Sequence, residues 1–468
     1  MTAIFWLSRD FRFADNSALT AAADHDLLVA VFFIDRQLRE QGAASRWRVQ
    51  RAVQAFAKEF SRRSDGRLLI LDGEPEEHLP RLCKDLSATE IYQSDWPCAV
   101  MRKVQDGVIA RLEGQAQLIL HQGHLLLHPR QIRAAGGGAY RVFTPFLRAL
   151  RRIGVERPLP EVSRIRVATG LPQGLDPESL NLAPDLHGGA PILEQYALPA
   201  GEKAALARLD TFLATCGTYP DLRDRPDRDA TSGLSEHLAV GEISPRTIWA
   251  IAIASAHAQE AKADREAVQK FLSEVAWREF AWHLLIDFPA MATRPWRNEW
   301  KDFPWQGRGE DFDAWSQART GVPLVDAGLR EMRVTGRMHN RVRMLCASYL
   351  TKHLLTDWRL GEAFFADSLT DWDPASNAMN WQWSAGSGPD ATPFFRIFNP
   401  ERQAQLFDPD GAYRHRWLSA ESHDAKAYFA TLPSRWRVPR DYPDPVDADT
   451  LKGGRERALA AWSEFRAE

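Results

Sequence analysis

The chain has 468 residues, with 59 Lys and Arg against 62 Asp and Glu, 44% hydrophobic residues and 26% charged residues. This composition is typical of a soluble globular protein and excludes a disordered chain, a collagen and a coiled coil. The formal net charge of -3 also excludes nucleic-acid binding through bulk positive charge, so a polyanion would need a local basic surface. A chain of this length predicts two domains.

Cysteine usage and hydropathy indicate a reducing compartment and no membrane. Cys83, Cys98, Cys216 and Cys346 stand far apart and form no C-x-x-C pair, which argues against a disulfide framework or a zinc ribbon. We therefore expect a cytoplasmic protein. The longest apolar runs, such as 248–254, are far shorter than the roughly 20 residues of a membrane helix, so no membrane partner is expected.

Short apolar runs alternate with amphipathic stretches over the first 130 residues, a pattern typical of a parallel sheet covered by helices. The predicted strands are 4–7, 27–34, 68–71, 90–93 and 117–121. Between the second and third strands, apolar residues recur at helical spacing from Val49 to Phe60, behind Ser45 as a candidate N-cap. No G-x-G-x-x-G follows the first strand, so this α/β domain is not expected to bind NAD.

The periodicity breaks at a glycine triplet from Gly136, and frequent prolines follow through Pro199. This composition predicts a long wrapping connection over 131–200. Helical periodicity dominates beyond it, as at Ser244, a capping residue followed by proline at the first helical position. The sequence therefore predicts an α/β domain over 1–130 and an all-helical domain over 201–468.

The stretch TSGLS, Thr231 to Ser235, places small and hydroxyl residues before a predicted helix. Backbone N–H groups there could approach a phosphate closely, although a capped surface turn would explain the same residues. On the next long helix, Glu274, Trp277 and Arg278 share a side, so an acid and an indole could border a planar ligand. The alternative is a solvated helix in which Glu274 pairs with Arg278.

The stretch 332–356 holds five basic residues and no acid, so phosphate contact there competes with a simple solvated arginine face. A helix that begins near Met338 would present Asn340, Arg343 and Met344 on one side, which offers an amide and a guanidinium to one ligand.

Two aspartates, Asp371 and Asp373, stand in a segment rich in tryptophan. They suggest general acid and base work or a metal, but no nearby histidine completes a typical ligand set, and the tryptophans could equally be core. His121, His124 and His128 have no acidic or thiolate companions, so we expect a loop of mostly surface histidines. No metal site is predicted.

Taken in order, these motifs resemble the cryptochrome/photolyase family, most closely class I cyclobutane pyrimidine dimer photolyases. The resemblance covers nearly the whole chain, from WLSRDFRFADNSAL through TSGLS, FLSEVAWREF and TGRMHNRVRM to ASNAMNWQW and PFFRIFNPERQ. It implies an α/β, Rossmann-like antenna domain followed by an all-helical domain that binds FAD. The implied enzyme is a deoxyribodipyrimidine photo-lyase, in which excited reduced FAD transfers an electron to a pyrimidine dimer flipped out of damaged DNA.

The resemblance also assigns roles to residues. FAD would be held by Tyr219, Thr231, Ser232, Gly233, Leu234, Ser235, Phe271, Arg278, Asn340, Arg343, Asp371, Trp372, Asp373 and Asn377. DNA and the flipped dimer would be contacted by Arg223, Glu274, Trp277, Asn340, Arg341, Met344, Trp383, Arg396 and Gln403. The catalytic groups would be Glu274, Asn340 and Asn377, and electrons would reach oxidised flavin through Trp305, Trp358 and Trp381.

The chain departs from the family pattern at several positions. Arg337 stands where close relatives carry an aromatic residue, and Phe271 where Trp is common, so the flavin environment could differ. The segments 97–103 and 292–293 lack the acid and the basic residue of a methenyltetrahydrofolate antenna site. A deazaflavin, or no second chromophore, is left as the alternative.

The resemblance leaves two functions open: repair of cyclobutane dimers and blue-light reception. We expect a monomer, and for the repair function we expect it to bind damaged DNA. Asn377, placed against flavin N5 by the resemblance, and the intact Glu274 and Trp277 pair favour repair of cyclobutane dimers. A cryptochrome-type blue-light photoreceptor with little or no repair activity is the alternative, which Arg337 keeps open. Repair of (6-4) photoproducts is disfavoured, because that branch expects two adjacent histidines where His339 precedes an asparagine.

Overall fold

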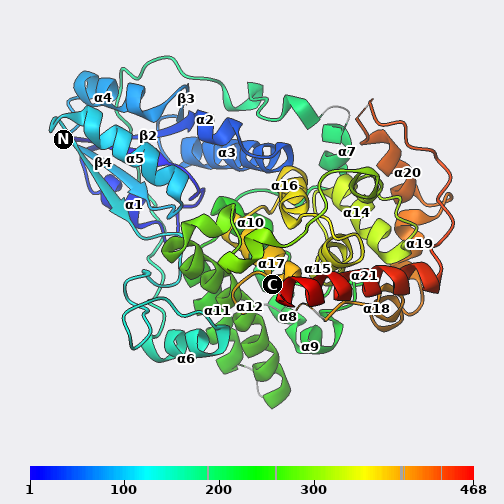
Figure 1. The fold of residues 1–468 in the computed structure, drawn as a ribbon. Helices are drawn as coiled ribbons and strands as arrows, with labels where there is room; N and C mark the ends of the chain where they lie inside the picture. The colour runs from blue at the N-terminus through cyan, green and yellow to red at the C-terminus, as the bar shows by residue number, and fades with distance from the viewer. Residues whose placement is uncertain (187–188, 259–260, 391–393, 395, 434, 468) are drawn as a thin grey trace.

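The computed structural model describes all residues of the chain except 187–188, 259–260, 391–393, 395, 434 and 468 (Figure 1). Five strands form one parallel sheet: β1 (Thr2–Leu7), β2 (Leu27–Ile34), β3 (Leu69–Asp72), β4 (Glu90–Ser94) and β5 (Gln117–His121). Their order across the sheet is β3-β2-β1-β4-β5. The five predicted strands are therefore confirmed to within two residues at each end.

The sheet is packed between helices, which explains its continuous apolar strands. Its helices are α1 (Ser17–Ala23), α2 (Arg36–Arg39), α3 (Ala43–Arg63), α4 (Pro75–Leu86) and α5 (Ala99–Leu112). β2 has seven buried residues of eight, as expected for a strand covered on both faces. On α3, the periodic residues from Val49 to Phe60 enter the core as predicted.

The predicted N-cap of α3 is wrong. The helix begins at Ala43, so Ser45 lies inside its first turn. The Ala43 N–H is instead accepted by Asp367 Oδ1, at 3.0 Å, from a helix of the other domain. Gly42 lies so close to that helix that a Cβ atom would come within 2.0 Å of the Ala366 carbonyl oxygen. The cap is therefore supplied by tertiary contact, which no local sequence pattern reveals.

Beyond residue 200, the described residues form helices and no β-strand. These helices are α8 (Glu202–Ala214), α9 (Tyr219–Leu222), α10 (Ser235–Val240), α11 (Pro245–Ala258), α12 (Lys262–Asp287), α13 (Glu310–Ser316), α14 (Pro323–Thr335), α15 (Asn340–Ser348), α16 (Trp358–Ser368), α17 (Pro374–Ala385), α18 (Pro400–Phe407), α19 (Ala412–Leu418), α20 (His423–Ala430) and α21 (Ala448–Ala467). Ser244 caps α11 as predicted, since its Oγ accepts the Thr247 N–H at 2.9 Å.

The described residues of the connecting stretch 131–200 form two α-helices, α6 (Phe143–Ile153) and α7 (Gly189–Gln195), and two short 3-10 helices, Pro177–Ser179 and Pro184–Leu186. α6 lies against α12 at the lower left of Figure 1. Phe143 at its first turn stacks on Trp277 of α12, with ring centroids 3.7 Å apart and planes within 9°. The connection therefore contributes directly to the position of a predicted site residue.

A buried ion cluster joins α3 of the sheet domain to the segment around α10. The Arg48 side chain is 1% exposed, bonds to Glu242 and lies 3.3 Å from Glu236. His237 Nδ1 lies 2.5 Å from Glu242 Oε2, the oxygen that Arg48 Nη2 also contacts. Thr370 donates to Glu236 at 2.9 Å and thereby links the cluster to the segment before α17. Two acids thus share the Arg48 cation at the junction of the two domains, and Arg337 lies 3.6 Å from Glu236.

We predict that Arg48→Ala lowers the free energy of unfolding by about 3 to 5 kcal/mol, because two buried carboxylates lose their cation. Urea denaturation followed by circular dichroism measures the change. The control is Arg62→Ala, whose side chain is 61% exposed and pairs with Glu59; its expected cost is below about 1 kcal/mol. Equal losses in both variants would contradict a stabilising role for the cluster.

The same cluster sets a pH dependence. Burial raises the pKa of Glu242, but Arg48 and His237 outweigh burial and lower it to about 2. A depressed carboxyl pKa stabilises the folded state above the unfolded value of about 4.5 and loses that effect as the pH falls towards 2. Between these pH values, the wild type should therefore lose more stability than Arg48→Ala.

Candidate active site

The TSGLS segment forms a tight loop at the start of α10. Gly233 has a positive φ of 62°, and a Cβ atom there would lie 2.9 Å from Arg208 Nε. Arg208 donates to the carbonyl oxygens of Thr231 and Ser232 at 3.0 and 2.8 Å. Within the described part of the chain, the N–H groups of Ser232 and Gly233 make no hydrogen bond. The loop therefore holds its carbonyls on Arg208 and keeps N–H groups free for an anion.

Arg278 does not pair with Glu274 as the alternative interpretation of α12 proposed. Arg278 donates to the His124 carbonyl oxygen at 3.0 Å and lies 2.8 Å from His124 Nε2, while Glu274 accepts from Arg223 at 2.6 Å. His124 is 5% exposed, so its prediction as a surface residue is wrong. Burial lowers the pKa of His124, which keeps the ring neutral and able to accept from Arg278.

The two aspartates of the tryptophan-rich segment have different partners. Asp371 pairs with Arg343 through contacts of 2.9 and 3.1 Å. Asp373 accepts from Trp282 Nε1 and from the Ser376 N–H, both at 2.8 Å, and so caps α17. No cluster of three His, Cys, Asp or Glu suited to a metal exists among the described residues. These acids therefore shape a wall of the site.

Asn377 is oriented by an acid that the sequence analysis missed. Its Nδ2 donates to the Glu362 carbonyl oxygen at 3.1 Å and to Glu362 Oε1 at 2.8 Å. Burial raises the pKa of Glu362 to about 7. Because the amide nitrogen is committed to Glu362, the Asn377 oxygen is left for another partner. Glu362 lies on α16, distant in sequence from Asn377, and no spacing pattern links the two.

Most predicted DNA contacts lie on α12, α15 and α17, while Arg223 follows α9, Arg396 precedes α18 and Gln403 lies on α18. Several already pair with one another or with acids. Glu274 is bound by Arg223, and Arg341 pairs with Asp224 at 2.7 Å. Asn340 Nδ2 lies 3.9 Å from Met344 Sδ, one turn along α15. The remaining members are the half-buried Trp383 and Gln403 and the exposed Arg396.

The three predicted electron-transfer tryptophans belong to one hydrophobic cluster. Trp358 and Trp381 are buried, and the half-buried Trp305 packs against the same cluster. A Cβ atom at Gly361 would lie 2.2 Å from Trp381 Cη2, so the indole lies directly on α16 beside Glu362. Trp315, which the sequence analysis did not single out, meets Trp381 edge to face at 6.2 Å.

The chain has a parallel-sheet domain followed by a helical domain. The helical domain combines a loop suited to an anion, buried guanidinium and carboxylate groups and a tryptophan cluster. This is the architecture of a flavoprotein, which binds a nucleotide cofactor. The chain belongs to the DNA photolyase family. Residues 3–163 match the family model described as DNA photolyase, and residues 271–464 match the FAD binding domain of DNA photolyase.

Individual relatives agree along the whole length. The deoxyribodipyrimidine photo-lyase of Agrobacterium fabrum is 36% identical over 98% of this chain and 97% of its own. That of Escherichia coli is 31% identical over 99% of both chains. A class III photolyase structure from Agrobacterium tumefaciens has 34% identity and a TM-score of 0.87 over 100% of this chain and 98% of its own. A Synechocystis cryptochrome has 26% identity and a TM-score of 0.82 over 98% and 99%.

These comparisons confirm the predicted family, fold class, enzyme class and FAD cofactor. The residues present also fit FAD. The free N–H groups of Ser232 and Gly233 suit a diphosphate, and Arg278 Nε is buried without a hydrogen-bond partner near Asp373, as a polar cofactor edge would require. In the described part of the chain, no helix is both long and apolar enough to span a bilayer.

We predict that Glu362→Gln makes the protein more stable at pH 8 but not at pH 5. A folded pKa raised to about 7 means that the folded state holds a proton that the unfolded state releases above about 4.5. Wild-type stability therefore falls as the pH rises from about 4.5 to 7, by at most about 3 kcal/mol. Thermal unfolding at both pH values measures the difference, with the exposed Glu310→Gln as control; a pH-independent gain would exclude titration of Glu362.

Proposed function

We propose that the protein repairs cyclobutane pyrimidine dimers in DNA under blue light. The observation that carries this proposal is the packing of α17 on both α12 and α15, three helices that bear most of the predicted lesion contacts beside the predicted FAD residues. Arg278 of α12 lies 3.8 Å from Asp373 at the start of α17, and Trp282 donates to the same carboxylate. The FAD residues and the lesion residues therefore share one set of helices.

FAD, when bound in its reduced form, supplies the light-driven electron. The chain's own groups orient the lesion and shape the surrounding charge. Trp277 is stacked on Phe143 and offers its other side to a base with little loss of side-chain freedom. A dimer stacks and pairs poorly in duplex DNA, so its extrusion costs less than that of intact bases.

The donors for a dimer carbonyl follow from the ion pairs. Glu274, one of the predicted catalytic groups, already accepts a hydrogen bond from Arg223 at 2.6 Å. Hydrogen bonds to dimer oxygens would then come from Asn340 and from Arg223 held by Glu274. These donors would stabilise the negative charge that develops on the dimer, because hydrogen bonds are stronger in a site from which the bound DNA excludes water.

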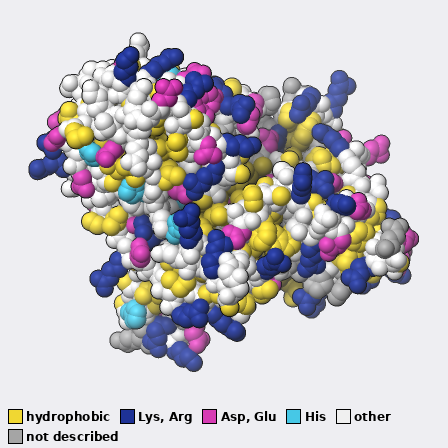
Figure 2. All heavy atoms as spheres, turned by 60° about the vertical axis from the view of Figure 1, so that its left-hand side comes forward, with side chains coloured by type: hydrophobic (Ala, Val, Ile, Leu, Met, Phe, Trp, Pro, Cys, Tyr) yellow, Lys and Arg dark blue, Asp and Glu magenta, His cyan; other side chains and the backbone are white. Residues whose placement is uncertain are grey.

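The duplex on either side of the lesion needs cations, and α6 supplies them. Arg148 and Arg152 are exposed and one turn apart, no described acid pairs with either, and α6 has no acidic residue. Arg151 donates to Gln269 of α12 at 3.3 Å, so the arginines extend from the Trp277 end along α12. Figure 2 shows Lys and Arg side chains along the lower edge of the molecule, the edge on which α6 lies in Figure 1.

A photoreceptor function is the second candidate, since the Synechocystis cryptochrome shares the fold. The case for it from Arg337 is weakened. Arg337 donates to the Tyr196 carbonyl oxygen at 3.0 Å and lies 3.6 Å from Glu236, so an acid already balances its charge. Asn377 and Trp277 favour repair.

We predict light-dependent repair by protein with anaerobically reduced FAD, given an oligonucleotide with one thymine dimer. Restoration of thymines under blue light and not in darkness supports the proposal. Photoreduction without dimer loss would contradict the repair proposal. Trp305→Phe should slow photoreduction of oxidised FAD at least tenfold and leave repair by chemically reduced protein unchanged; equal loss of both would exclude a separate electron route through Trp305.

We also predict that the double variant Arg148→Gln, Arg152→Gln weakens binding of damaged and undamaged duplexes alike. The slope of log K against log salt should become shallower by up to about 1.8, because each lost phosphate contact removes about 0.9. The matched control is Arg81→Gln, Arg111→Gln, two exposed arginines of the sheet domain. A change in affinity for the dimer alone, with an unchanged salt slope, would exclude backbone contact by α6.

A further inference from the structure

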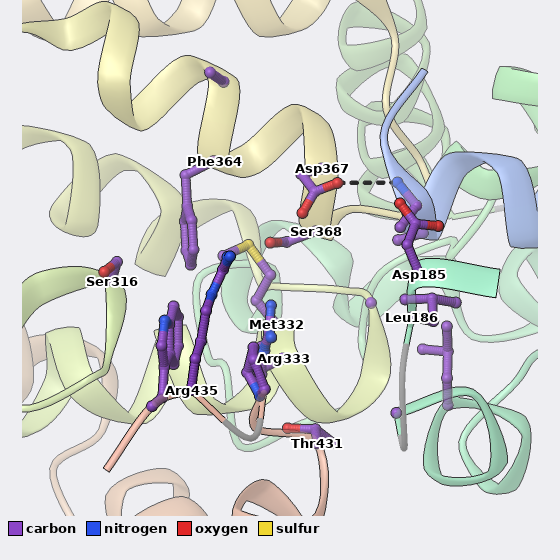
Figure 3. Close-up of a pocket in the computed structure, with 18 of the residues that line it drawn as sticks. Asp185, Leu186, Ser316, Met332, Arg333, Phe364, Asp367, Ser368, Thr431 and Arg435 are labelled. Atoms are coloured by element: carbon purple, nitrogen blue, oxygen red, sulfur yellow. Dashed lines mark hydrogen bonds between the residues drawn. The ribbon is translucent and has the colours of Figure 1, made fainter. Parts of the chain in front are cut away.

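A cavity of about 330 Å³ opens between the sheet domain and the helical domain. The start of α3, α7, α13, α14, α16 and the segment after α20 surround it (Figure 3). None of its lining residues belongs to the predicted FAD or DNA sets. Its volume lies in the range of small-molecule sites, which often occur at domain junctions.

Two guanidinium groups in this cavity lack a carboxylate partner. Arg333 and Arg435 both line it, and no described acid forms an ion pair with either. Burial lowers the pKa of Arg333, and Arg435 lowers it further by repulsion, although Tyr428 and Asp367 oppose them. Figure 3 shows the two side chains side by side. Arg333 is half-buried and Arg435 is exposed, so an anion bound between them would relieve the repulsion that Arg435 exerts on Arg333.

Neither described acid that lines the cavity forms an ion pair with Arg333 or Arg435, although Asp367 attracts Arg333 at longer range. Asp185 holds Arg46 through contacts of 2.6 and 2.7 Å. Asp367 accepts the Ala43 N–H that caps α3, drawn as a dashed line in Figure 3. The third arginine of the lining, Arg308, lies 3.2 Å from Asp313. Only Arg333 and Arg435 therefore remain without an acid.

The rest of the lining suits a ring and a phosphate oxygen. The Ser368 Oγ is buried, lines the cavity and has no hydrogen-bond partner. The Arg333 guanidinium covers the face of Trp436, 5.1 Å from the ring centroid. Phe312 and Phe364, which also line the cavity, meet edge to face with ring centroids 6.5 Å apart. The cavity thus combines a free hydroxyl donor, two free cations and aromatic surfaces.

We propose that this cavity binds a phosphate monoester that carries a planar heteroaromatic ring, of the size of a mononucleotide. A phosphate monoester carries about -1.5 to -2 charges at neutral pH, which matches the two unpaired guanidinium groups. Arginine contacts phosphate oxygens through paired N–H groups, and the Ser368 hydroxyl donates to a third oxygen. The ring stacks against the aromatic walls. This inference is independent of dimer repair.

The test uses FAD-loaded protein titrated calorimetrically with adenosine 5′-monophosphate, adenosine and inorganic phosphate. The monophosphate should bind at least tenfold more tightly than either fragment, because only it engages both halves of the site. Arg333→Gln and Arg435→Gln should each weaken the monophosphate at least tenfold and leave adenosine unchanged. Arg308→Gln, whose cation is already paired, is the matched control and should change affinity less than twofold.

Two further measurements keep the result unambiguous. Arg333→Gln removes an unpaired cation, so its thermal midpoint without ligand should not fall, and a folded variant that does not bind supports the proposal. Saturation with a dimer-containing oligonucleotide should leave monophosphate binding intact. Displacement by that oligonucleotide, affinity no greater than that of inorganic phosphate, or unchanged binding in Arg333→Gln would each overturn the proposal.

Discussion

The position of the predicted cofactor site depends on one buried ion cluster. Arg48 belongs to the sheet domain, while Glu236 and Glu242 belong to the segment that begins at the TSGLS loop. Because the cluster is almost fully buried, neither acid can lose its cation without a large free-energy cost. The loop with free N–H groups is thereby held at a defined place against α3. Thr370, bonded to Glu236, extends this restraint to Asp371 on the far wall of the site.

Helix α12 provides a second connection between the domains. Two of its charged side chains bind backbone groups of the segment that follows the sheet. Glu279 accepts the N–H groups of Leu126 and Leu127 at 2.9 and 3.0 Å, and Arg278 next to it binds the His124 carbonyl. Burial raises the pKa of Glu279 to about 7, which these N–H donors only partly offset. The same helix presents Trp277 and Glu274 on another side. A shift in the relative position of the two domains would therefore displace α12, and with it the predicted lesion contacts Trp277 and Glu274.

Much of this arrangement could be predicted from the sequence, and the exceptions have a common physical cause. The five strands and the Ser244 cap are local patterns, and the structure confirms them. The prediction of Ser45 as the N-cap of α3 failed because Asp367, more than 300 positions away in the sequence, accepts the N–H group at the start of the helix. His124 was misplaced for the same reason, since Arg278 makes its burial possible. The roles given to the site residues rest on resemblance to the family and stay predictions.

The partnership of Asn377 and Glu362 shows how much the residue roles depend on such tertiary contacts. An asparagine can present either its oxygen or its nitrogen, and its own sequence neighbourhood does not decide which. Glu362 accepts from the nitrogen, both through its carboxylate and through its backbone carbonyl, so the nitrogen keeps this orientation whichever protonation state the acid adopts. With a pKa of about 7, Glu362 changes its charge near neutral pH. Glu362 is the next residue after Gly361, against which the Trp381 indole packs. Ionisation of Glu362 therefore changes the electric field at the Asn377 amide and at the Trp381 indole, while the positions of both side chains stay constant.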